Sequence, residues 1–267
     1  HIIHDNLMQF LEIFIYSLIQ GLTEFLPISS SAHLYFLEEV FHWTNKTVLY
    51  ALAAHLGTLI AVLYNQRNNI YFLLKKSLYF KGEFQYLICI LISSFPVIFI
   101  GAIVSLFFSN VYNSILIIIG TASIIGGVFL DISDNYKQNK KSNSKITYKI
   151  AILTGLFQTL ALIPGMSRSG TVITALRICS INRYESIKFS LLTGIPILII
   201  ASLYSIYKLT ELDRNISYTF FFISFISFTS ALFSIKFILS LIKRYSFRLF
   251  AIYRIIFGLV IYMYLIY

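Results

Sequence analysis

Two short stretches concentrate the side chains that could do chemistry in an otherwise apolar chain. The first, QGLTEFLPISSSAHL, places an amide, a carboxylate, three hydroxyls and an imidazole around a proline: Gln20, Glu24, Ser29, Ser30, Ser31 and His33. The second, PGMSRSGT, combines glycines, hydroxyls and a guanidinium: Gly165, Ser167, Arg168, Ser169, Gly170 and Thr171. Glycines, hydroxyls, an arginine fork and the free N–H groups of a helix start suit an oxyanion with several acceptor oxygens, above all phosphate.

The spacing within the first stretch predicts how its polar groups are arranged. Gln20 and Glu24 are four residues apart, so on a helix they lie on one face. The serines after Pro27 are good N-cap residues for a short following helix, and His33 lies about one turn beyond Ser30.

The composition identifies the environment of these groups. The chain has 267 residues, of which 58% are hydrophobic and 12% charged, about half the charge of a soluble domain. Several apolar runs approach or exceed the roughly 20 residues that span a bilayer as a helix. We therefore expect an all-α, polytopic integral membrane protein with a single transmembrane domain over residues 1–267, and we assign no role to Cys89 or Cys179.

The formal net charge of +10 raises the question of a nucleic-acid partner. In a polytopic protein, excess Lys and Arg is typical of cytoplasmic loops that face anionic lipid. We therefore expect membrane lipid, and no nucleic acid, as the partner of this charge.

The order of apolar and basic segments predicts a topology. The apolar segments lie at 8–26, 47–64, 86–107, 113–130, 148–163, 186–207, 218–241 and 249–266. The Lys and Arg residues gather in four connections, at 65–85, 131–149, 177–188 and 242–248, which we expect to be cytoplasmic. The remaining connections and both termini are expected on the opposite side.

This orientation requires two re-entrant hairpins. Only one long segment, 148–163, and one short stretch, 167–178, separate two basic connections, and a short helix of about 11 residues covers roughly half of the hydrocarbon thickness. The chain is therefore expected to enter, break at Pro164-Gly165 and return. The same argument predicts a hairpin from 8–26 and 34–43 that enters from the other face and breaks at Pro27.

The two hairpins predict an internal duplication. SLIQGLTEFLPISSS is faintly similar to GLFQTLALIPGMSRS, which favours inverted-topology repeats with halves of about 1–130 and 131–267. Unpaired N–H groups at each break must be shielded by protein or line a wet cavity, because lipid cannot satisfy them.

Structural roles compete with functional ones. Single hydroxyls in membrane helices often bond to their own backbone, and Glu24 and Arg168 could simply neutralise each other. Ionisable groups at membrane depth are nevertheless costly and normally face a functional cavity, which favours a role for Glu24, His33 and Arg168. We expect a core hydrogen bond for His55, and we expect Lys236 and Arg254 to reach the interface from segment ends, outside the site.

The two motifs resemble the signature regions of the bacterial undecaprenyl-diphosphatase family, the integral-membrane enzymes associated with bacitracin resistance, with patterns (E/Q)xxxE…PxSSxxH and PGxSRSxxT. YESIKFSLLTGIP and FAIYRIIFG extend the resemblance over the chain. It implies hydrolysis of a C55 polyprenyl diphosphate to the monophosphate carrier of cell-wall synthesis, in the bacterial cytoplasmic membrane with the site open to the outer face. Val172 departs from the pattern where relatives have threonine, with Thr171 and Thr174 flanking it.

The resemblance and the residue types together give a mechanistic hypothesis. Arg168 and helix-start N–H groups hold the diphosphate, Ser30 is the nucleophile or positions a water, and His33 acts as base and then acid. Glu24 orients His33 or ligates a divalent cation such as Mg²⁺ or Ca²⁺. Gln20, Ser29, Ser31, Gly165, Ser167, Ser169, Gly170 and Thr171 are expected to line the phosphate site.

The sequence is also compatible with functions other than hydrolysis. Inverted repeats with broken helices are also typical of secondary transporters, so a transporter or flippase of a lipid-linked phosphate is the alternative to the enzyme. A purely structural scaffold would not need three ionisable residues in the bilayer. The sequence is compatible with a homodimer as well as a monomer.

Overall fold

The structure is a computed structural model that describes residues 2–43, 48–77, 79–107, 115–136, 145–211 and 218–266. These residues form ten α-helices and one short 3₁₀-helix. The elements are α1 (Ile2–Glu24), α2 (Ser30–Val40), α3 (Val48–Ser77), α4 (Lys81–Phe107), α5 (Ile115–Asn135), α6 (Tyr148–Thr159), η1 (Leu160–Leu162), α7 (Arg168–Ile178), α8 (Arg183–Glu211), α9 (Tyr218–Leu241) and α10 (Arg248–Ile266). The expected all-α fold is confirmed.

Five of the described helices are long and apolar enough to cross a membrane. They correspond to Lys81–Ser105, Ile115–Asn135, Arg183–Tyr207, Tyr218–Leu241 and Arg248–Ile266. Their lipid-facing character is visible in exposed large apolar side chains such as Phe95, Phe129 and Phe225, which a soluble surface would not carry in such numbers. The chain is therefore a multi-pass membrane protein.

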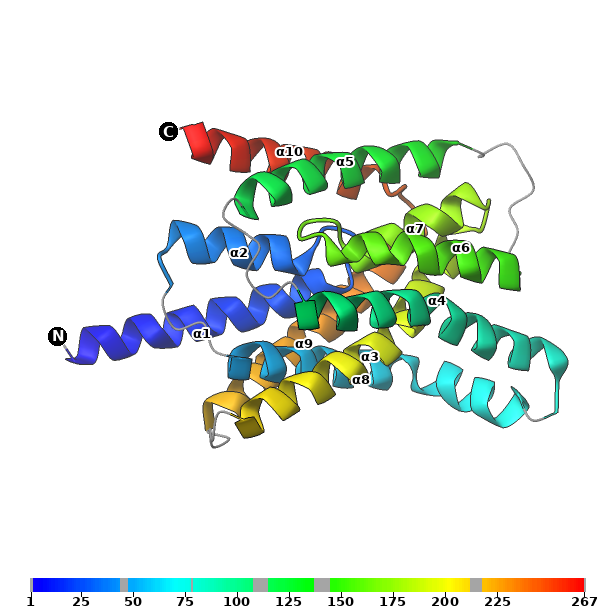
Figure 1. The fold of residues 1–267 in the computed structure, drawn as a ribbon, viewed down its shortest axis with the longest axis horizontal. Helices are drawn as coiled ribbons and strands as arrows, with labels where there is room; N and C mark the ends of the chain where they lie inside the picture. The colour runs from blue at the N-terminus through cyan, green and yellow to red at the C-terminus, as the bar shows by residue number, and fades with distance from the viewer. Residues whose placement is uncertain are drawn as a thin grey trace.

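The two expected breaks are present as opposed helical hairpins. In Figure 1, α1 and α2 fold back to one end of the molecule, whereas α6 and α7 fold back to the other end, and their bends meet in the middle. We call residues 25–29 the first elbow and residues 163–167 the second elbow. That the hairpins enter and leave one face of a bilayer stays a prediction, as do the repeat boundaries.

Long helices surround the two hairpins and hold them in place. α9 packs against α1 and α3, α5 packs against α10, and α4 packs against α6. Small residues allow close approach at these contacts: a Cβ on Gly57 would come within 2.3 Å of the Ser224 carbonyl oxygen, and one on Gly21 within 2.5 Å of the Ser227 carbonyl oxygen.

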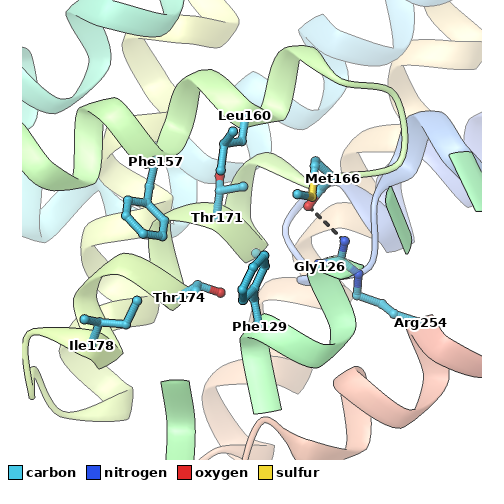
Figure 2. A pocket seen from close by; sticks show the side chains of 10 residues that line it. Gly126, Phe129, Phe157, Leu160, Met166, Thr171, Thr174, Ile178 and Arg254 are labelled. Atoms are coloured by element: carbon cyan, nitrogen blue, oxygen red, sulfur yellow. Dashed lines mark hydrogen bonds between the residues drawn. The ribbon is translucent and has the colours of Figure 1, made fainter. Parts of the chain in front are cut away.

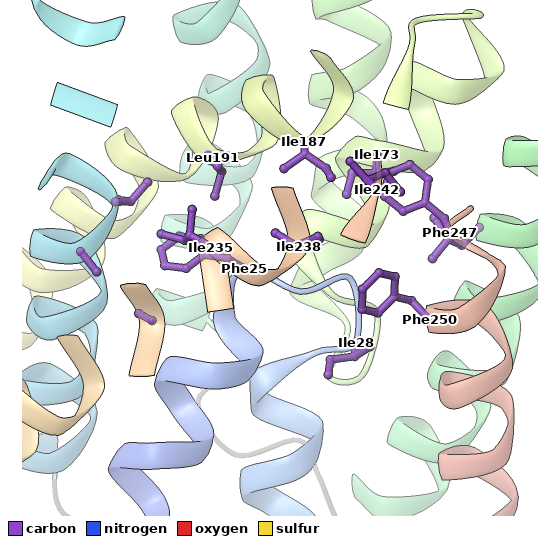
Figure 3. Close-up of a cluster of buried hydrophobic side chains, with 14 of the residues drawn as sticks. Phe25, Ile28, Ile173, Ile187, Leu191, Ile235, Ile238, Ile242, Phe247 and Phe250 are labelled. Carbon is purple, nitrogen blue, oxygen red and sulfur yellow. The ribbon is translucent and has the colours of Figure 1, made fainter. Parts of the chain in front are cut away.

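The main core surrounds the first elbow. Phe25 and Ile28 pack with side chains of α7, α8, α9 and α10, among them Ile173 and Phe250 (Figure 3). Residues Ser169–Arg177 of α7 are all buried, so this short helix lies inside protein. That both breaks are shielded by protein or line a wet cavity stays a prediction.

A buried carboxylate ties four helices together near the ends of α5 and α7. The Asp134 carboxylate accepts hydrogen bonds from Arg177 Nε (2.8 Å), Arg183 Nε (2.9 Å) and the Phe247 backbone N–H (3.0 Å). Because the partners come from α7, from the start of α8 and from the residue before α10, this cluster fixes the outer end of the second hairpin.

Candidate active site

The first elbow results from a proline followed by a strained serine cap. Pro27 has no N–H to continue a helix, and α2 starts three residues later. Ser29 has φ 74° and ψ 100°, and its Oγ accepts from the Ala32 N–H at 3.4 Å. The Oγ atoms of Ser29 and Ser31 lie 3.2 Å apart. Of the three serines that the sequence offers as N-cap residues, Ser29 takes this position.

The second elbow repeats this construction. After η1, Gly165 takes φ 97°, and the cap Ser167 has φ 64° and ψ 115°. The Ser167 Oγ accepts from the Gly170 N–H at 3.1 Å and lies 3.2 Å from the Ser169 Oγ. A positive φ at serine costs on the order of 1–3 kcal/mol and recurs at functional sites. Two such caps of matching geometry are what an internal duplication would produce.

The elbows touch each other at the centre of the molecule. The Ser169 Oγ, in the first turn of α7 directly after the second elbow, donates to the Leu26 carbonyl oxygen of the first elbow at 2.8 Å. Arg168 Nη2 lies 3.7 Å from Glu24 Oε1, and the two side chains are 12% and 10% exposed. The structure therefore brings together a carboxylate and a guanidinium that are far apart in the sequence.

Arg168 has one guanidinium nitrogen held and one available. Its Nη1 donates to the Ser190 carbonyl oxygen of α8 at 2.7 Å, whereas Nη2 is buried without a hydrogen-bond partner. Space for the guanidinium comes from Gly194, where a Cβ would lie 2.5 Å from Nη1. An oriented fork with an unused donor is a ready binding group for a phosphate oxygen.

Glu24 is the centre of a hydrogen-bonded polar cluster. Its Oε2 accepts from Ser30 Oγ at 2.8 Å and from Gln20 Nε2 at 2.9 Å. Gln20 Nε2 also lies 3.3 Å from His55 Nδ1. The expected hydrogen bond of His55 is therefore present, and its partner belongs to the site. The expected placement of Gln20 and Glu24 on one helix face is confirmed.

His33 makes different contacts from those expected. Its Nδ1 lies 2.6 Å from the Ser29 carbonyl oxygen and its Nε2 2.7 Å from the Tyr253 hydroxyl, and its ring stacks on Phe257 at 4.3 Å. Because a carbonyl only accepts, Nδ1 carries the proton and Nε2 accepts from Tyr253. Glu24 pairs with Ser30 and does not orient His33, so that part of the hypothesis is wrong in this structure.

The remaining residues of the second motif line two different environments. The Thr171 Oγ1 donates to the Arg168 carbonyl oxygen at 2.8 Å, and the side chain faces a cavity of about 210 Å³. Figure 2 shows this cavity between Phe129, Phe157 and the hydroxyls of Thr171 and Thr174. Val172, the departure from the family pattern, is fully buried in an apolar cluster and offers nothing to a phosphate.

Two functional candidates on α10 escaped the sequence reasoning. Tyr253 binds His33, and Arg254, which we expected to reach the interface, is 1% exposed. Its Nη2 donates to the carbonyl oxygens of Ala122, Gly165 and Met166 at 3.2, 3.1 and 3.0 Å. That expectation is wrong, because the side chain turns inward toward α5. The only local signal for a buried Arg254 side chain was the pair Gly126-Gly127, which leaves room for it.

The fold and the site together define a polytopic helical membrane protein with a partly buried serine–carboxylate–arginine cluster suited to an oxyanion. Residues 13–260 match the family described as bacitracin resistance protein BacA. The chain belongs to this family.

Curated relatives extend over nearly the whole chain. The sequence is 34% identical to an undecaprenyl-diphosphatase of Pelagibacter ubique (strain HTCC1062), over 94% of this chain and 96% of that protein. It is also 34% identical to an undecaprenyl-diphosphatase of Methanococcus aeolicus, over 97% of this chain and 100% of that protein. A third, from Campylobacter curvus (strain 525.92), is 34% identical over 94% of this chain and 97% of its own length.

Proposed function

We propose that this protein is an undecaprenyl-diphosphatase, a membrane hydrolase that removes the terminal phosphate of undecaprenyl diphosphate. The observation that carries the assignment is the hydrogen bond from Ser30 Oγ to Glu24 Oε2, beside an arginine with an unused donor. A carboxylate that accepts the proton of a hydroxyl is the arrangement that activates a nucleophile. Transport of a lipid phosphate would not need that pair, so hydrolysis is favoured over the flippase alternative.

The chemistry follows from these contacts. Glu24 takes the proton of Ser30, the Ser30 oxygen forms a bond to the terminal phosphorus, and the bridging P–O bond breaks to release the polyprenyl monophosphate. Glu24 passes this proton to the departing monophosphate and is again a base. It then takes a proton from a water molecule, whose oxygen bonds to the phosphorus of the phosphoserine while the bond between phosphorus and the Ser30 oxygen breaks. Glu24 returns the proton to the Ser30 oxygen, and inorganic phosphate leaves. Arg168 and the N–H groups at the start of α7 bind the charge on the phosphoryl oxygens throughout.

A divalent cation fits this site only with help from the substrate. Among the described residues, no group of three His, Cys, Asp or Glu side chains could hold a metal ion. Mg²⁺ is commonly bound by one or two carboxylates together with substrate phosphates, a set that Glu24 and the diphosphate provide. When bound, such an ion would supply charge neutralisation of the phosphates.

The site is proposed to open to the outer face of the bacterial cytoplasmic membrane. Lys and Arg are concentrated in the connections at 65–85, 131–149, 177–188 and 242–248, which supports a cytoplasmic position for these segments. The first hairpin, which carries Glu24 and Ser30, ends away from them.

Phosphate release from undecaprenyl diphosphate by the purified protein in detergent tests the function. Wild type is expected to release phosphate, and Ser30→Ala to lower kcat by at least about 100-fold, the scale of a lost nucleophile or its acid–base partner. Ser105→Ala, on an exposed face of α4, is the matched control and should keep wild-type rates. Parallel assays with a chelator test whether turnover requires a divalent cation. Wild-type turnover by Ser30→Ala would rule out the serine mechanism, and no release by wild type would reject the function.

A further inference from the structure

Arg254 is a buried cation that the proposed reaction does not use. The fold makes room for it at two glycines: a Cβ on Gly126 would lie 2.0 Å from its Nη2, and a Cβ on Gly170 would lie 2.8 Å from its Nη1. The first glycine belongs to α5 and the second to the first turn of α7. An arginine in such a cleared space is held in one orientation.

The charge of Arg254 has no counterion among the described residues. No carboxylate oxygen there lies within 4.0 Å of its nitrogens, and its Nε is buried without a hydrogen-bond partner. Arg177 of α7 is also buried but contrasts with Arg254 of α10, because Arg177 is paired with Asp134 at 2.8 Å. Removing an unpaired charge from water is costly, so its retention calls for a compensating group.

The position of Arg254 indicates what that group is. It holds the carbonyl oxygens of Gly165 and Met166, which immediately precede the cap Ser167, as the dashed line to Met166 in Figure 2 illustrates. The N–H groups of α7 begin on the other side of that cap, next to Arg168. The preceding residue, Tyr253, contacts His33 of the first hairpin. Arg254 thus lies behind the helix start at which an oxyanion would bind.

We propose that Arg254 is a positioning residue of the diphosphate site and its second positive charge. It fixes the second elbow so that the N–H groups of α7 face the phosphate, and the bound anion balances the charge that is unpaired in the free protein. This inference rests on the proposed function, and it adds a residue that supports the phosphate from behind the elbow.

Two readouts test it: steady-state kinetics with undecaprenyl diphosphate, and the rise in thermal-unfolding midpoint that inorganic pyrophosphate causes. Arg254→Gln is expected to raise KM about tenfold or more, the scale of a lost charge-assisted interaction, and to lose most of the pyrophosphate-induced rise. Arg254→Lys keeps the charge but not the fork, so it should retain part of both. Arg177→Lys, the matched control, should start from a lower midpoint with KM and the pyrophosphate-induced rise unchanged.

A second pair of variants displaces the side chain without removing it. Gly126→Ala puts a methyl group at the guanidinium and should reproduce the effects of Arg254→Gln, whereas Gly82→Ala, with open space around it, should behave as wild type. The proposal is overturned if Arg254→Lys keeps both the wild-type KM and the wild-type pyrophosphate-induced rise, and if either Arg254→Gln or Gly126→Ala keeps them as well. If wild type responds to pyrophosphate through Arg254 but releases no phosphate, the hydrolase assignment fails and the anion site stands.

Discussion

At the scale of single residues, the site depends on how each hydrogen-bonding atom is occupied. Glu24 accepts two hydrogen bonds on one oxygen, and its other oxygen faces Arg168. His33 has both ring nitrogens engaged, one by its own helix start and the other by Tyr253. Ser30 is therefore within reach of a carboxylate base, while His33 can take part in proton transfer only after its bond to Tyr253 opens.

Tyr253→Phe tests this reading of His33. The substitution removes the hydroxyl and keeps the aromatic ring that lies parallel to His33 at 5.7 Å. Loss of one hydrogen bond of about 1 kcal/mol should change kcat severalfold, with KM and the thermal midpoint nearly unchanged. Tyr204→Phe, on the exposed surface of α8, serves as the comparison. An unchanged kcat would mean that the Tyr253 hydroxyl has no part in turnover.

At the scale of helices, glycines decide how closely the scaffold packs around the elbows. Gly57 of α3 and Gly21 of α1 let α9 approach both helices, and α9 in turn carries Ile235 and Ile238 of the core around the first elbow. Backbone atoms of α9 lie within 3.0 Å of a Cβ at either position, so a rotamer change alone cannot accommodate a side chain there.

Gly57→Ala should separate α3 from α9 and lower stability by about 1–3 kcal/mol, the usual cost of overpacking. Thermal unfolding in detergent measures the effect, and Gly82→Ala is again the control. Equal midpoints for the two variants would show that the α3–α9 contact is looser than this structure has it. The folded fraction of Gly57→Ala should lose less activity than the drop in its thermal-unfolding midpoint would suggest. The reason is that Gly57 contacts no residue of the serine–carboxylate–arginine cluster.

Most helices could be predicted from the sequence, because apolar runs and the breaks at Pro27 and Pro164 are local signals. The helix α3 runs to Ser77, well beyond the apolar segment that ends at 64, because its polar continuation still consists of residues that a helix tolerates. The contacts of the site were harder. The Glu24–Arg168 pair followed from charge at membrane depth, but the partners of His33 and Arg254 depend on how α10 is rotated, which no local pattern encodes.

At the scale of the whole molecule, the asymmetry of charge predicts which ends of the helices face the cytoplasm. The start of α1 and the end of α10 lie at the same end of the molecule, as expected for termini on one side (Figure 1). The end of α5, which carries Asp134, lies toward the other end of the molecule, as do the end of α3 and the start of α4 (Figure 1). Once one of these two ends is assigned to the cytoplasm, the orientation of every helix is therefore fixed.

Thiol labelling of intact cells tests the orientation. In a Cys179→Ser background, Glu39→Cys at the exposed end of α2 is expected to react with a membrane-impermeant maleimide added outside, whereas Lys243→Cys should react only after permeabilisation. Both positions are exposed, so access and not burial decides the result. The reverse pattern would place the site on the cytoplasmic face and exclude a role on the outer leaflet.

The contact between Ser169 and Leu26 has a further consequence for how this protein loses activity. The proposed nucleophile Ser30 and its base Glu24 come from the first hairpin and the guanidinium of Arg168 from the second. The helix α1 packs mainly on α9, whereas α6 packs mainly on α4. A shift of one hairpin relative to the other by the width of a single atom would leave every helix intact and still separate these groups. Turnover should consequently vanish during mild warming or membrane thinning, while circular dichroism reports no lost structure.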